Sequence, residues 1–439
     1  MIGTPNQPHR FLDAARSRSA PTGSRTKPRL TGASMPRTRS WRLWNCLLAG
    51  ASAGVGWVCA QSPPKDPDAE PSPALSLEEI NVETETVVPE PAPETQASLY
   101  DKIWGYTTLY SNDENNVIQE LSFVGRFQLD YAMIPAEDFQ EWNIRRFRLG
   151  AEAVFFHDFT AHIEVELAPQ EDSVFTRLTD AYVAWSRSPE FVATLGKQSA
   201  PFTMDGSTSS KRLLTIDRSN LANNLWFTQE YFPGIGVAGE PDPWLYHAAV
   251  YGTGSANQYL GNYDASLFVV STIGYDFAEK LDAREAVLAF DFVFNQEDED
   301  DEVTRDFGYV FSLHGSLQKD KWGVRADLAG GLGYGTQSDV WGAMIMPFYN
   351  LTDRIQAVTR YTFVKSTAEN GVRFARYESE VVSGMGDRYN EFYLGLNYYF
   401  YGDKLKIQTG VDYANMRDEA DDGGAYNGWG WTTGLRISW

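Results

Sequence analysis

Apolar and polar side chains alternate with a period of two along much of the chain after residue 117. In the first such segment one face reads Leu121, Phe123, Gly125, Phe127, Leu129 and Tyr131, and the other reads Glu120, Ser122, Arg126, Gln128 and Asp130, with Val124 as the exception. Period two is the repeat of a β-strand, because successive side chains point to opposite faces of a sheet. The polar face carries ions, which is expected if that face meets a water-filled lumen while the other face meets lipid.

Sixteen segments have the composition or the alternation of strands. They are residues 118–132, 142–156, 159–168, 176–186, 190–198, 232–240, 244–252, 265–277, 284–295, 305–318, 321–335, 340–350, 353–366, 388–401, 404–415 and 429–439. Most of them reach the roughly 9–11 residues that a tilted strand needs to cross the hydrocarbon of a bilayer. We therefore predict an all-β chain that folds as a single transmembrane antiparallel β-barrel of 16 strands.

The connections between these segments alternate in length. Connections after even-numbered segments are short, such as 157–158 and 402–403, whereas those after odd-numbered segments include 199–231 and 367–387. Outer-membrane barrels have short turns on the periplasmic side and long loops on the extracellular side. A secreted β-sandwich or propeller, the competing fold, needs no such asymmetry and places its apolar face inside.

The end of the chain also favours an outer-membrane barrel. Trp431, Leu435, Ile437 and the terminal Trp439 alternate with small or polar residues. A final strand that ends on an aromatic residue resembles the signal that the barrel-assembly machinery reads. We therefore expect two partners, this machinery at the C-terminal strand and the lipid of the outer membrane around the barrel.

Charge and hydropathy exclude two other classes of protein. The chain has 37 Lys and Arg residues against 59 Asp and Glu residues, for a net charge of −22. Because acidic surfaces repel phosphate backbones, we expect no nucleic-acid partner. The mean hydropathy is −0.38, and no segment of the expected mature chain offers the roughly 18–20 continuous apolar residues of a membrane-spanning helix, so a multi-helix membrane protein is excluded.

Residues 1–60 have the features of an export signal. The first 34 residues are rich in Arg, Ser and Pro, and Met35 opens a better start: a basic stretch with Arg37, Arg39 and Arg42, then an uncharged stretch from residue 43 to 57. Val58-Cys59-Ala60 supplies residues that a signal peptidase accepts. We predict translation from Met35 and cleavage after Ala60; the alternative is an uncleaved anchor helix.

The positions of the cysteines and of the acidic residues distinguish the signal region, a linker and the rest of the chain. Cys46 and Cys59 both lie in the signal region, so the mature chain would have no disulfide, thiolate metal site or cysteine nucleophile. Residues 61–100 hold one Lys, nine acids and many prolines, which predicts an acidic, Pro-rich disordered linker. Residues 101–439, with a net charge of −22, are the predicted porin-like barrel.

Several motifs that usually indicate a cofactor, a metal or catalysis have a simpler explanation here. Residues 234–239 match the dinucleotide fingerprint, yet Pro233 precedes them and a Pro-rich turn follows, so no helix can begin there to bind a pyrophosphate. We interpret the segment as a glycine-rich strand and predict no cofactor. The five histidines lack zinc-protease spacing, and the six acids at 297–302 suit either a loose cation cluster or, as we favour, a solvated loop. We predict no metal site and no catalytic residues.

Short motifs in a fixed order carry a resemblance to a known family. They are Arg145-Arg146-Phe147-Arg148-Leu149-Gly150, Thr179-Asp180-Ala181-Tyr182-Val183, Leu195-Gly196-Lys197-Gln198, Pro201-Phe202, Thr208-Ser209-Ser210, Asp217-Arg218-Ser219, Gly395-Leu396-Asn397-Tyr398-Tyr399 and Leu405-Lys406-Ile407-Gln408. Their order and spacing across residues 101–439 resemble the phosphate-selective porin O and P family. The resemblance implies a 16-stranded, homotrimeric outer-membrane porin whose third extracellular loop folds into the lumen.

The same resemblance implies a constriction lined by positive charge. The residues in the corresponding places are Arg126, Arg146 and Arg148 on the predicted lumen face and Lys211, Arg212 and Arg218 on the loop 199–231. The lumen face also holds acids, among them Glu120, Asp130, Glu152, Glu164, Glu166 and Asp327, so phosphate selectivity does not follow directly. Either the arginines favour anions in the pore, or Arg146 and Arg148 are neutralised by Glu152 and its neighbours and brace the wall.

Three classes of function follow. The first is a passive, water-filled outer-membrane channel for small hydrophilic solutes, including anions such as phosphate or polyphosphate, which would catalyse no reaction. The second is an enzyme on a barrel scaffold, and the third is a structural or adhesive surface barrel. The long loop that the resemblance folds into the lumen favours the channel.

Overall fold

The computed structural model describes four ranges of the chain, 98–226, 231–253, 266–298 and 304–439. They belong to one compact unit, which comprises Pro71–Trp439. The predicted signal region, and the predicted linker up to residue 97, lie outside the described residues. Among the residues described, no helix is long and apolar enough to span a membrane.

Seventeen strands are named in the described ranges. They are β1 Thr108–Ser111, β2 Ile118–Ile134, β3 Phe139–Phe155, β4 Phe159–Leu167, β5 Phe175–Ser188, β6 Phe191–Ser199, β7 Tyr231–Gly239, β8 Trp244–Gly252, β9 Leu267–Asp276, β10 Glu285–Asn295, β11 Phe307–Lys319, β12 Trp322–Gly333, β13 Val340–Asn350, β14 Ile355–Ser366, β15 Arg388–Tyr401, β16 Leu405–Arg417 and β17 Tyr426–Ser438. The sixteen predicted strands correspond to β2–β17, and no end differs from its predicted position by more than three residues. Only β1 was not predicted.

The helices are short. They are α1 Leu99–Gly105, the 3-10 turn η2 Pro135–Glu137, α2 Met204–Ser207, α3 Asn220–Leu225, α4 Ala278–Leu281 and α5 Glu378–Val381. Of these, α2 and α3 belong to the connection between β6 and β7, and α5 belongs to the connection between β14 and β15. These two connections enter the interior of the barrel, as described below.

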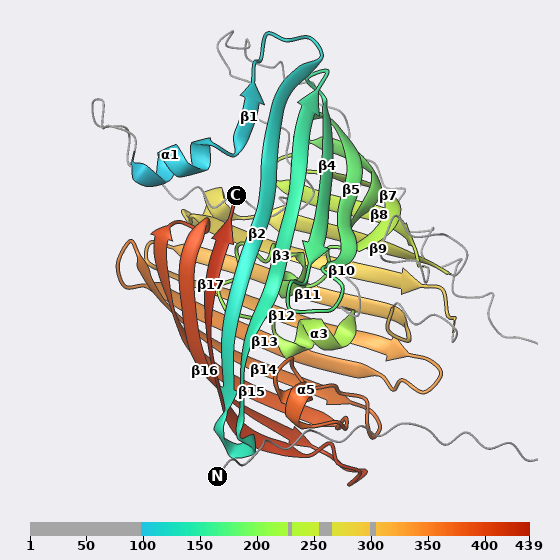
Figure 1. Cartoon of the computed structure of the whole chain (residues 1–439). Coiled ribbons are helices and arrows are strands. Elements are labelled where there is room, and N and C mark those ends of the chain that lie inside the picture. Colours follow the sequence, from blue (N-terminus) through green and yellow to red (C-terminus); the bar gives the residue numbers. More distant parts are fainter. Residues whose placement is uncertain (1–97, 227–230, 254–265, 299–303) are drawn as a thin grey trace, which may run out of the picture. The chain divides into compact units, whose positions relative to one another are not determined.

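Strands β2–β17 form a closed ring. Each strand pairs antiparallel with its successor, and β17 closes the ring on β2 from Trp431↔Met133 to Ser438↔Arg126 (Figure 1). Beyond that point β2 continues toward its own start and pairs with β1, where Tyr110 lies opposite Leu121. The edge of β2 is therefore covered first by β17 and then by β1, and closure leaves little strand edge to pair with other chains.

The apolar faces point outward, as the alternation predicts for a barrel in lipid. Leu328 on β12 is 53% exposed and Phe392 on β15 is 51% exposed, whereas the charged neighbours Asp327 and Glu391 are 4% and 3% exposed. A soluble sandwich would reverse this arrangement, because its apolar face has to be removed from water. The burial pattern thus excludes the competing fold.

The two ends of the ring differ. One end has short turns, such as 320–321 and 402–404, and the other has the long connections 200–230 and 367–387. Exposed aromatic residues lie near both ends. Those near the short turns include Trp185, Trp244, Trp322 and Tyr349, and those near the long connections include Trp142, Trp341, Trp429 and Trp431. Aromatic girdles of this kind mark the two lipid–water interfaces of outer-membrane barrels.

Candidate functional site

The described part of the connection 200–230, residues 200–226, lies inside the ring of strands. Its backbone is hydrogen-bonded to inward side chains on opposite sides of the ring. On one side, Gln128 of β2 donates to Ser210 O at 3.0 Å, and Lys406 Nζ of the nearby strand β16 donates to Leu213 O at 3.0 Å. On the other side, Thr203 N of the connection donates to Asp291 Oδ2 of β10 at 2.8 Å. The connection therefore crosses the lumen.

The middle of this connection is tied to a wall of four strands. Arg360 of β14 donates to Thr215 Oγ1 at 2.9 Å and to Asp217 O at 2.8 Å, and its Nη2 pairs with Glu391 Oε1 of β15 at 2.8 Å. Arg436 of β17 donates to Ile216 O at 3.3 Å. These donors are buried, so their hydrogen bonds act in surroundings with little water, where leaving a polar group unpaired is costly.

The start of the connection is tied to another part of the wall. Thr203 N donates to Asp291 Oδ2 of β10 at 2.8 Å, and Met204 N donates to Asp327 Oδ2 of β12 at 2.9 Å. Both acceptors are carboxylates on the inner face, and charge-assisted bonds to backbone N–H groups are stronger than neutral ones. The two carboxylates hold the residues that begin α2.

Helix α3 adds an apolar attachment. Leu221, Leu225 and Trp226 are completely buried, and the Trp226 ring lies 4.9 Å from that of Phe268 on β9 in an edge-to-face arrangement. Ser219 caps the helix by accepting a hydrogen bond from Ala222 N. The interior of this barrel therefore contains a small apolar core around α3, which the alternation of the strands does not predict.

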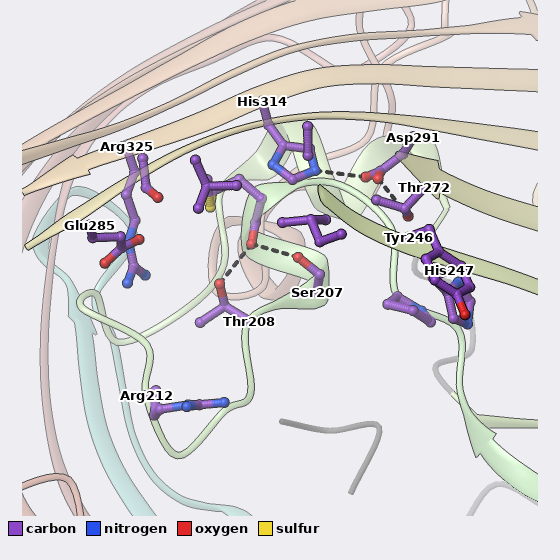
Figure 2. Close-up of a pocket in the computed structure, with 16 residues that line it drawn as sticks. Ser207, Thr208, Arg212, Tyr246, His247, Thr272, Glu285, Asp291, His314 and Arg325 are labelled. Carbon is purple, nitrogen blue, oxygen red and sulfur yellow. Dashed lines mark hydrogen bonds and ion pairs between the residues drawn. The ribbon is translucent and has the colours of Figure 1, made fainter. Parts of the chain in front are cut away.

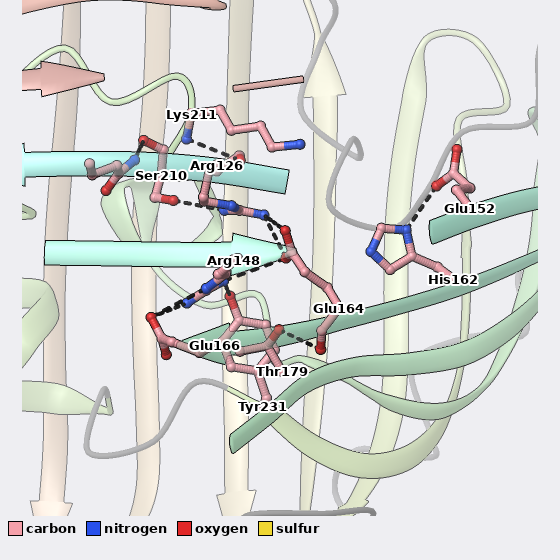
Figure 3. A network of polar contacts seen from close by, with 12 residues as sticks. Arg126, Arg148, Glu152, His162, Glu164, Glu166, Thr179, Ser210, Lys211 and Tyr231 are labelled. Carbon is pink, nitrogen blue, oxygen red and sulfur yellow. Dashed lines mark hydrogen bonds and ion pairs between the residues drawn. The ribbon is translucent and has the colours of Figure 1, made fainter. Parts of the chain in front are cut away.

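Arg126 and Arg148, two of the predicted constriction residues, lie in a buried ionic network (Figure 3). Arg126 pairs with Glu164 Oε2 at 3.0 Å and donates to Ser210 Oγ at 2.8 Å. Arg148 pairs with Glu166 Oε1 at 3.4 Å. Both arginines are 2% exposed or less, so each faces a carboxylate rather than open water.

The other four predicted constriction residues, Arg146, Lys211, Arg212 and Arg218, lie in different surroundings. Arg146 is buried and donates to Gln128 Oε1 at 2.9 Å. Arg218 donates to the backbone carbonyls of Asp205 and Thr208, at 2.8 and 3.2 Å. Lys211, Arg212 and Arg218 all have intermediate exposure, and Lys211 and Arg212 lie in a turn of the connection.

A cavity lies between the connection and the wall formed by β8–β12 (Figure 2). It has a volume of about 100 Å³ and is partly open to solvent. The connection contributes Ser207, Thr208 and Arg212, and the wall contributes acidic, basic and hydroxyl side chains. The wall residues include His247, Thr272, Glu285, Asp291, His314, Ser316 and Arg325. The cavity is thus lined by β8–β12, whereas the Arg126 network lies on β2–β4.

Arg145 is an inward residue that the period of two assigns to the outer face. The pairing of β2 with β3 shifts by one residue between Gln128 and Leu129, which leaves Arg145 as the extra residue of a bulge. Its Nε donates to Asp217 Oδ1 at 3.2 Å. Burial alone would raise the pKa of Asp217, but Arg145 and further guanidinium groups hold it well below its usual range. In the sequence, the signal available for this bulge was the pair of consecutive arginines Arg145 and Arg146.

A second connection, 367–387, also enters the ring, which sequence reasoning missed. Tyr377 Oη donates to Asp130 Oδ2 of β2 at 3.1 Å, and Arg373 N donates to Asn224 Oδ1 of α3 at 2.7 Å. Two long connections therefore contact each other inside the lumen. The length of 367–387 was visible in the sequence, but its direction depends on these distant contacts.

Helix α5 of the second connection carries a buried acid. Burial, together with the nearby carboxylates of Asp412 and Glu391, raises the pKa of Glu378 to about 8. Tyr389 Oη lies 3.5 Å from Glu378 Oε1. The connection is thus docked against like charges, which favours a protonated Glu378.

Three potential metal ligands gather on β4 and β5. Single ligand atoms of His162, Glu164 and Asp180 lie within 4.8 Å of one another. Glu164 already pairs with Arg126, and His162 Nδ1 lies 2.9 Å from Glu152 Oε2. Because guanidinium groups compete with a cation for the same carboxylate, the arrangement favours an ion-pair network. The acidic run 297–302 extends beyond the described residues after position 298.

The architecture defines a class of protein. A closed ring of sixteen antiparallel strands with an apolar exterior, an ionic interior and an inward connection is that of an outer-membrane porin. Residues 122–273 match the model of the family described as phosphate-selective porin O and P, which confirms the resemblance found in the sequence. The family match and the fold favour a channel over an enzyme.

Solved structures share this fold. OmpF of Salmonella typhi in complex with daunomycin is 11% identical, with coverage of 76% of this chain and 100% of that chain and a TM-score of 0.55. OmpT of Vibrio cholerae, an outer membrane protein, is 13% identical (73% and 97% coverage, TM-score 0.50), and Pseudomonas putida OprB at high pH is 8% identical (72% and 93% coverage, TM-score 0.50). No curated protein sequence is significantly similar to the chain.

Proposed function

We propose that this outer-membrane porin is a passive channel whose open path runs between the connection 200–230 and the wall β8–β12. The cavity in that place is the observation that carries the proposal. Other parts of the interior contain the buried Arg126 network and the apolar core around α3. Water and small solutes would therefore pass on one side of the connection only.

The charges along this path differ from those predicted for the whole lumen. Arg212 and Arg325 line the cavity together with the acids Glu285 and Asp291 (Figure 2). Asp291 is engaged by Thr203 N, Thr272 and His314. The balance of these four charges is therefore close to neutral, and Lys211 is the neighbour of Arg212 in the sequence.

We infer a modest preference for small anions, among which phosphate-like solutes are the class that the family description names. Charges on the outer loops act weakly, because ionic strength screens them within about 8 Å. The net charge of −22 should therefore matter less than Lys211, Arg212 and Arg325. Arg126, Arg146 and Arg148 brace the wall in this account, and their charges act on solutes only weakly.

The experiment is the reversal potential of the purified chain in planar bilayers across a KCl gradient. We expect the unmodified chain to favour chloride modestly, and Lys211→Glu with Arg212→Glu to shift the reversal potential toward potassium. The matched control is Lys321→Glu with Arg354→Glu, which changes the total charge equally at exposed turn positions. An identical reversal potential in all three would contradict the assignment of selectivity to Lys211 and Arg212.

Simpler experiments can test the predicted homotrimer, the predicted recognition by the barrel-assembly machinery, and the alternative functions as an enzyme or an adhesive barrel. Crosslinking in native outer membranes would report a trimer as a band at three times the monomer mass. An enzyme would need a group that acts on substrate, and Asp291 in the cavity is engaged by Thr203 N, Thr272 and His314, which positions the connection. This engagement supports a channel.

A further inference from the structure

Helix α1 is attached to the barrel by one face. Tyr100 stacks on Tyr401 of β15 with the ring centroids 5.4 Å apart, and Trp104 lies 5.2 Å from the same ring. Trp104 Nε1 donates to Ser438 O at 2.6 Å, and Tyr401 Oη donates to Asp101 Oδ1 at 2.6 Å. The helix is therefore fixed at the end of β17, where the ring closes.

A neighbouring face of α1 is apolar and is not covered by the residues that the structure describes. Leu99, Ile103 and Tyr106 are 70%, 49% and 82% exposed. Their spacing of four and three residues places them in one stripe along a helix. Leu109, which follows in β1, is 62% exposed as well. Burying such side chains in an apolar medium is favourable, at roughly 1.5–3 kcal/mol for a large side chain.

The stripe continues a surface that already faces lipid. Strand β1 pairs with β2 beside Leu121, and Leu121 and Phe123 are exposed members of the outward apolar face of β2. Tyr401 precedes the short turn 402–404, so α1 lies at the short-turn end. In outer-membrane barrels that end faces the periplasm. The apolar stripe is therefore at the level of the periplasmic lipid–water interface.

We propose that Leu99, Ile103 and Tyr106 form an interfacial anchor that inserts into the phospholipid of the periplasmic leaflet. The chemistry that it recognises is the boundary between headgroups and acyl chains, where an apolar helix face is buried by about 5–10 Å. Lys102 and Lys404 carry positive charge at this end and suit anionic phospholipid headgroups. The anchor would fix the seam between β2 and β17 to the membrane.

The test uses a fluorophore at position 103 of the full chain. With Cys46→Ser and Cys59→Ser in the background, Ile103→Cys is labelled with an environment-sensitive dye, and the protein is placed in nanodiscs of phosphatidylcholine and phosphatidylglycerol. We expect a blue-shifted emission that lipids brominated near the headgroup end of their acyl chains quench. Leu394→Cys, an outward residue of β15, is the lipid-exposed control, and Glu419→Cys on a long connection is the water-exposed control.

Two further variants keep the outcome decisive. Leu99→Ser with Tyr106→Ser leaves the Tyr100 and Trp104 contacts intact, and we expect it to shift the emission of the dye at position 103 to the red. The proposal is overturned if the dye at position 103 has the same emission and the same lack of quenching by brominated lipid as the dye at Glu419→Cys. It is also overturned if the dye is shielded from water without quenching by lipid, because another copy of the chain or residues 61–97 would then cover the stripe. Disulfide formation between two copies of Ile103→Cys identifies the former.

Discussion

Arg126 and Glu164 form an ion pair of 3.0 Å in the barrel interior, although both side chains are 2% exposed or less. The two residues come from β2 and β4, with β3 between them, and Arg148 of β3 lies 3.9 Å from the same carboxylate. One carboxylate thus serves two guanidinium groups. The stability of this part of the wall depends on that carboxylate being charged.

Replacing Glu164 by Gln keeps the shape and removes the charge. Because both guanidinium groups would then be incompletely compensated in a buried site, we expect the free energy of unfolding to fall by about 3–5 kcal/mol. Urea unfolding in detergent micelles, followed by tryptophan fluorescence, measures it. Glu152→Gln, at a more exposed carboxylate of β3, is the control and should cost about 1 kcal/mol or less. Equal losses in the two variants would contradict the role of the network.

Arg360 positions the connection 200–230. Arg360→Gln removes the charged donor to Thr215 and Asp217 and leaves Glu391 without its ion pair, so we expect a looser connection in the lumen. Trypsin should then cleave at Lys211, Arg212 or Arg218 faster than in the unmodified chain. Arg354→Gln, an exposed arginine at the start of the same strand, is the control. Cleavage at equal rates in all three proteins would show that Arg360 does not hold the connection.

The strands and their outward faces could be predicted from the sequence, whereas the contacts inside the barrel could not, and the reason is physical. Lipid on one side and water on the other impose a period of two on every strand, so Leu121 or Phe392 can be assigned from its neighbours alone. The pair Arg126–Glu164 depends instead on the registers of two strand pairings. The docking of Tyr377 on Asp130 joins residues 247 positions apart. Neither leaves a local signal, and the bulge at Arg145 changes the face of a residue that alternation assigns to the outside.

Glu378 should make the connection 367–387 sensitive to pH. Its pKa is raised to about 8 in the folded protein from an ordinary value of 4.5. The docked state therefore binds more protons than the free one, and its stability is full below pH 4.5 and falls as pH rises toward 8. We expect trypsin cleavage at Arg373 and Arg376 to increase between pH 6 and pH 8 and to level off above pH 8, after correction for the activity of the protease. In Glu378→Gln this increase should be absent; the same increase there would assign it to other groups.

Trp439 completes the seam between the two ends of the barrel. Its backbone exchanges two hydrogen bonds with Gly125, at 3.0 and 3.1 Å, and its ring stacks on Phe123. Deleting Trp439, or changing it to Asp, should prevent assembly, because the last strand must pair with the first. The measurement is the amount of heat-modifiable barrel in outer membranes. Normal amounts in both variants would refute this role.

The central claim is that solutes pass between the connection 200–230 and the wall β8–β12. Single-channel recording of a cysteine variant tests it directly. Ser316→Cys lines the cavity on β11, and Thr160→Cys is buried on β4 near the Arg126 network, both with Cys46→Ser and Cys59→Ser. We predict stepwise, ohmic conductance in each, and a drop after addition of a charged methanethiosulfonate for Ser316→Cys only. Absence of conductance steps, or a block at Thr160→Cys and none at Ser316→Cys, would contradict the account.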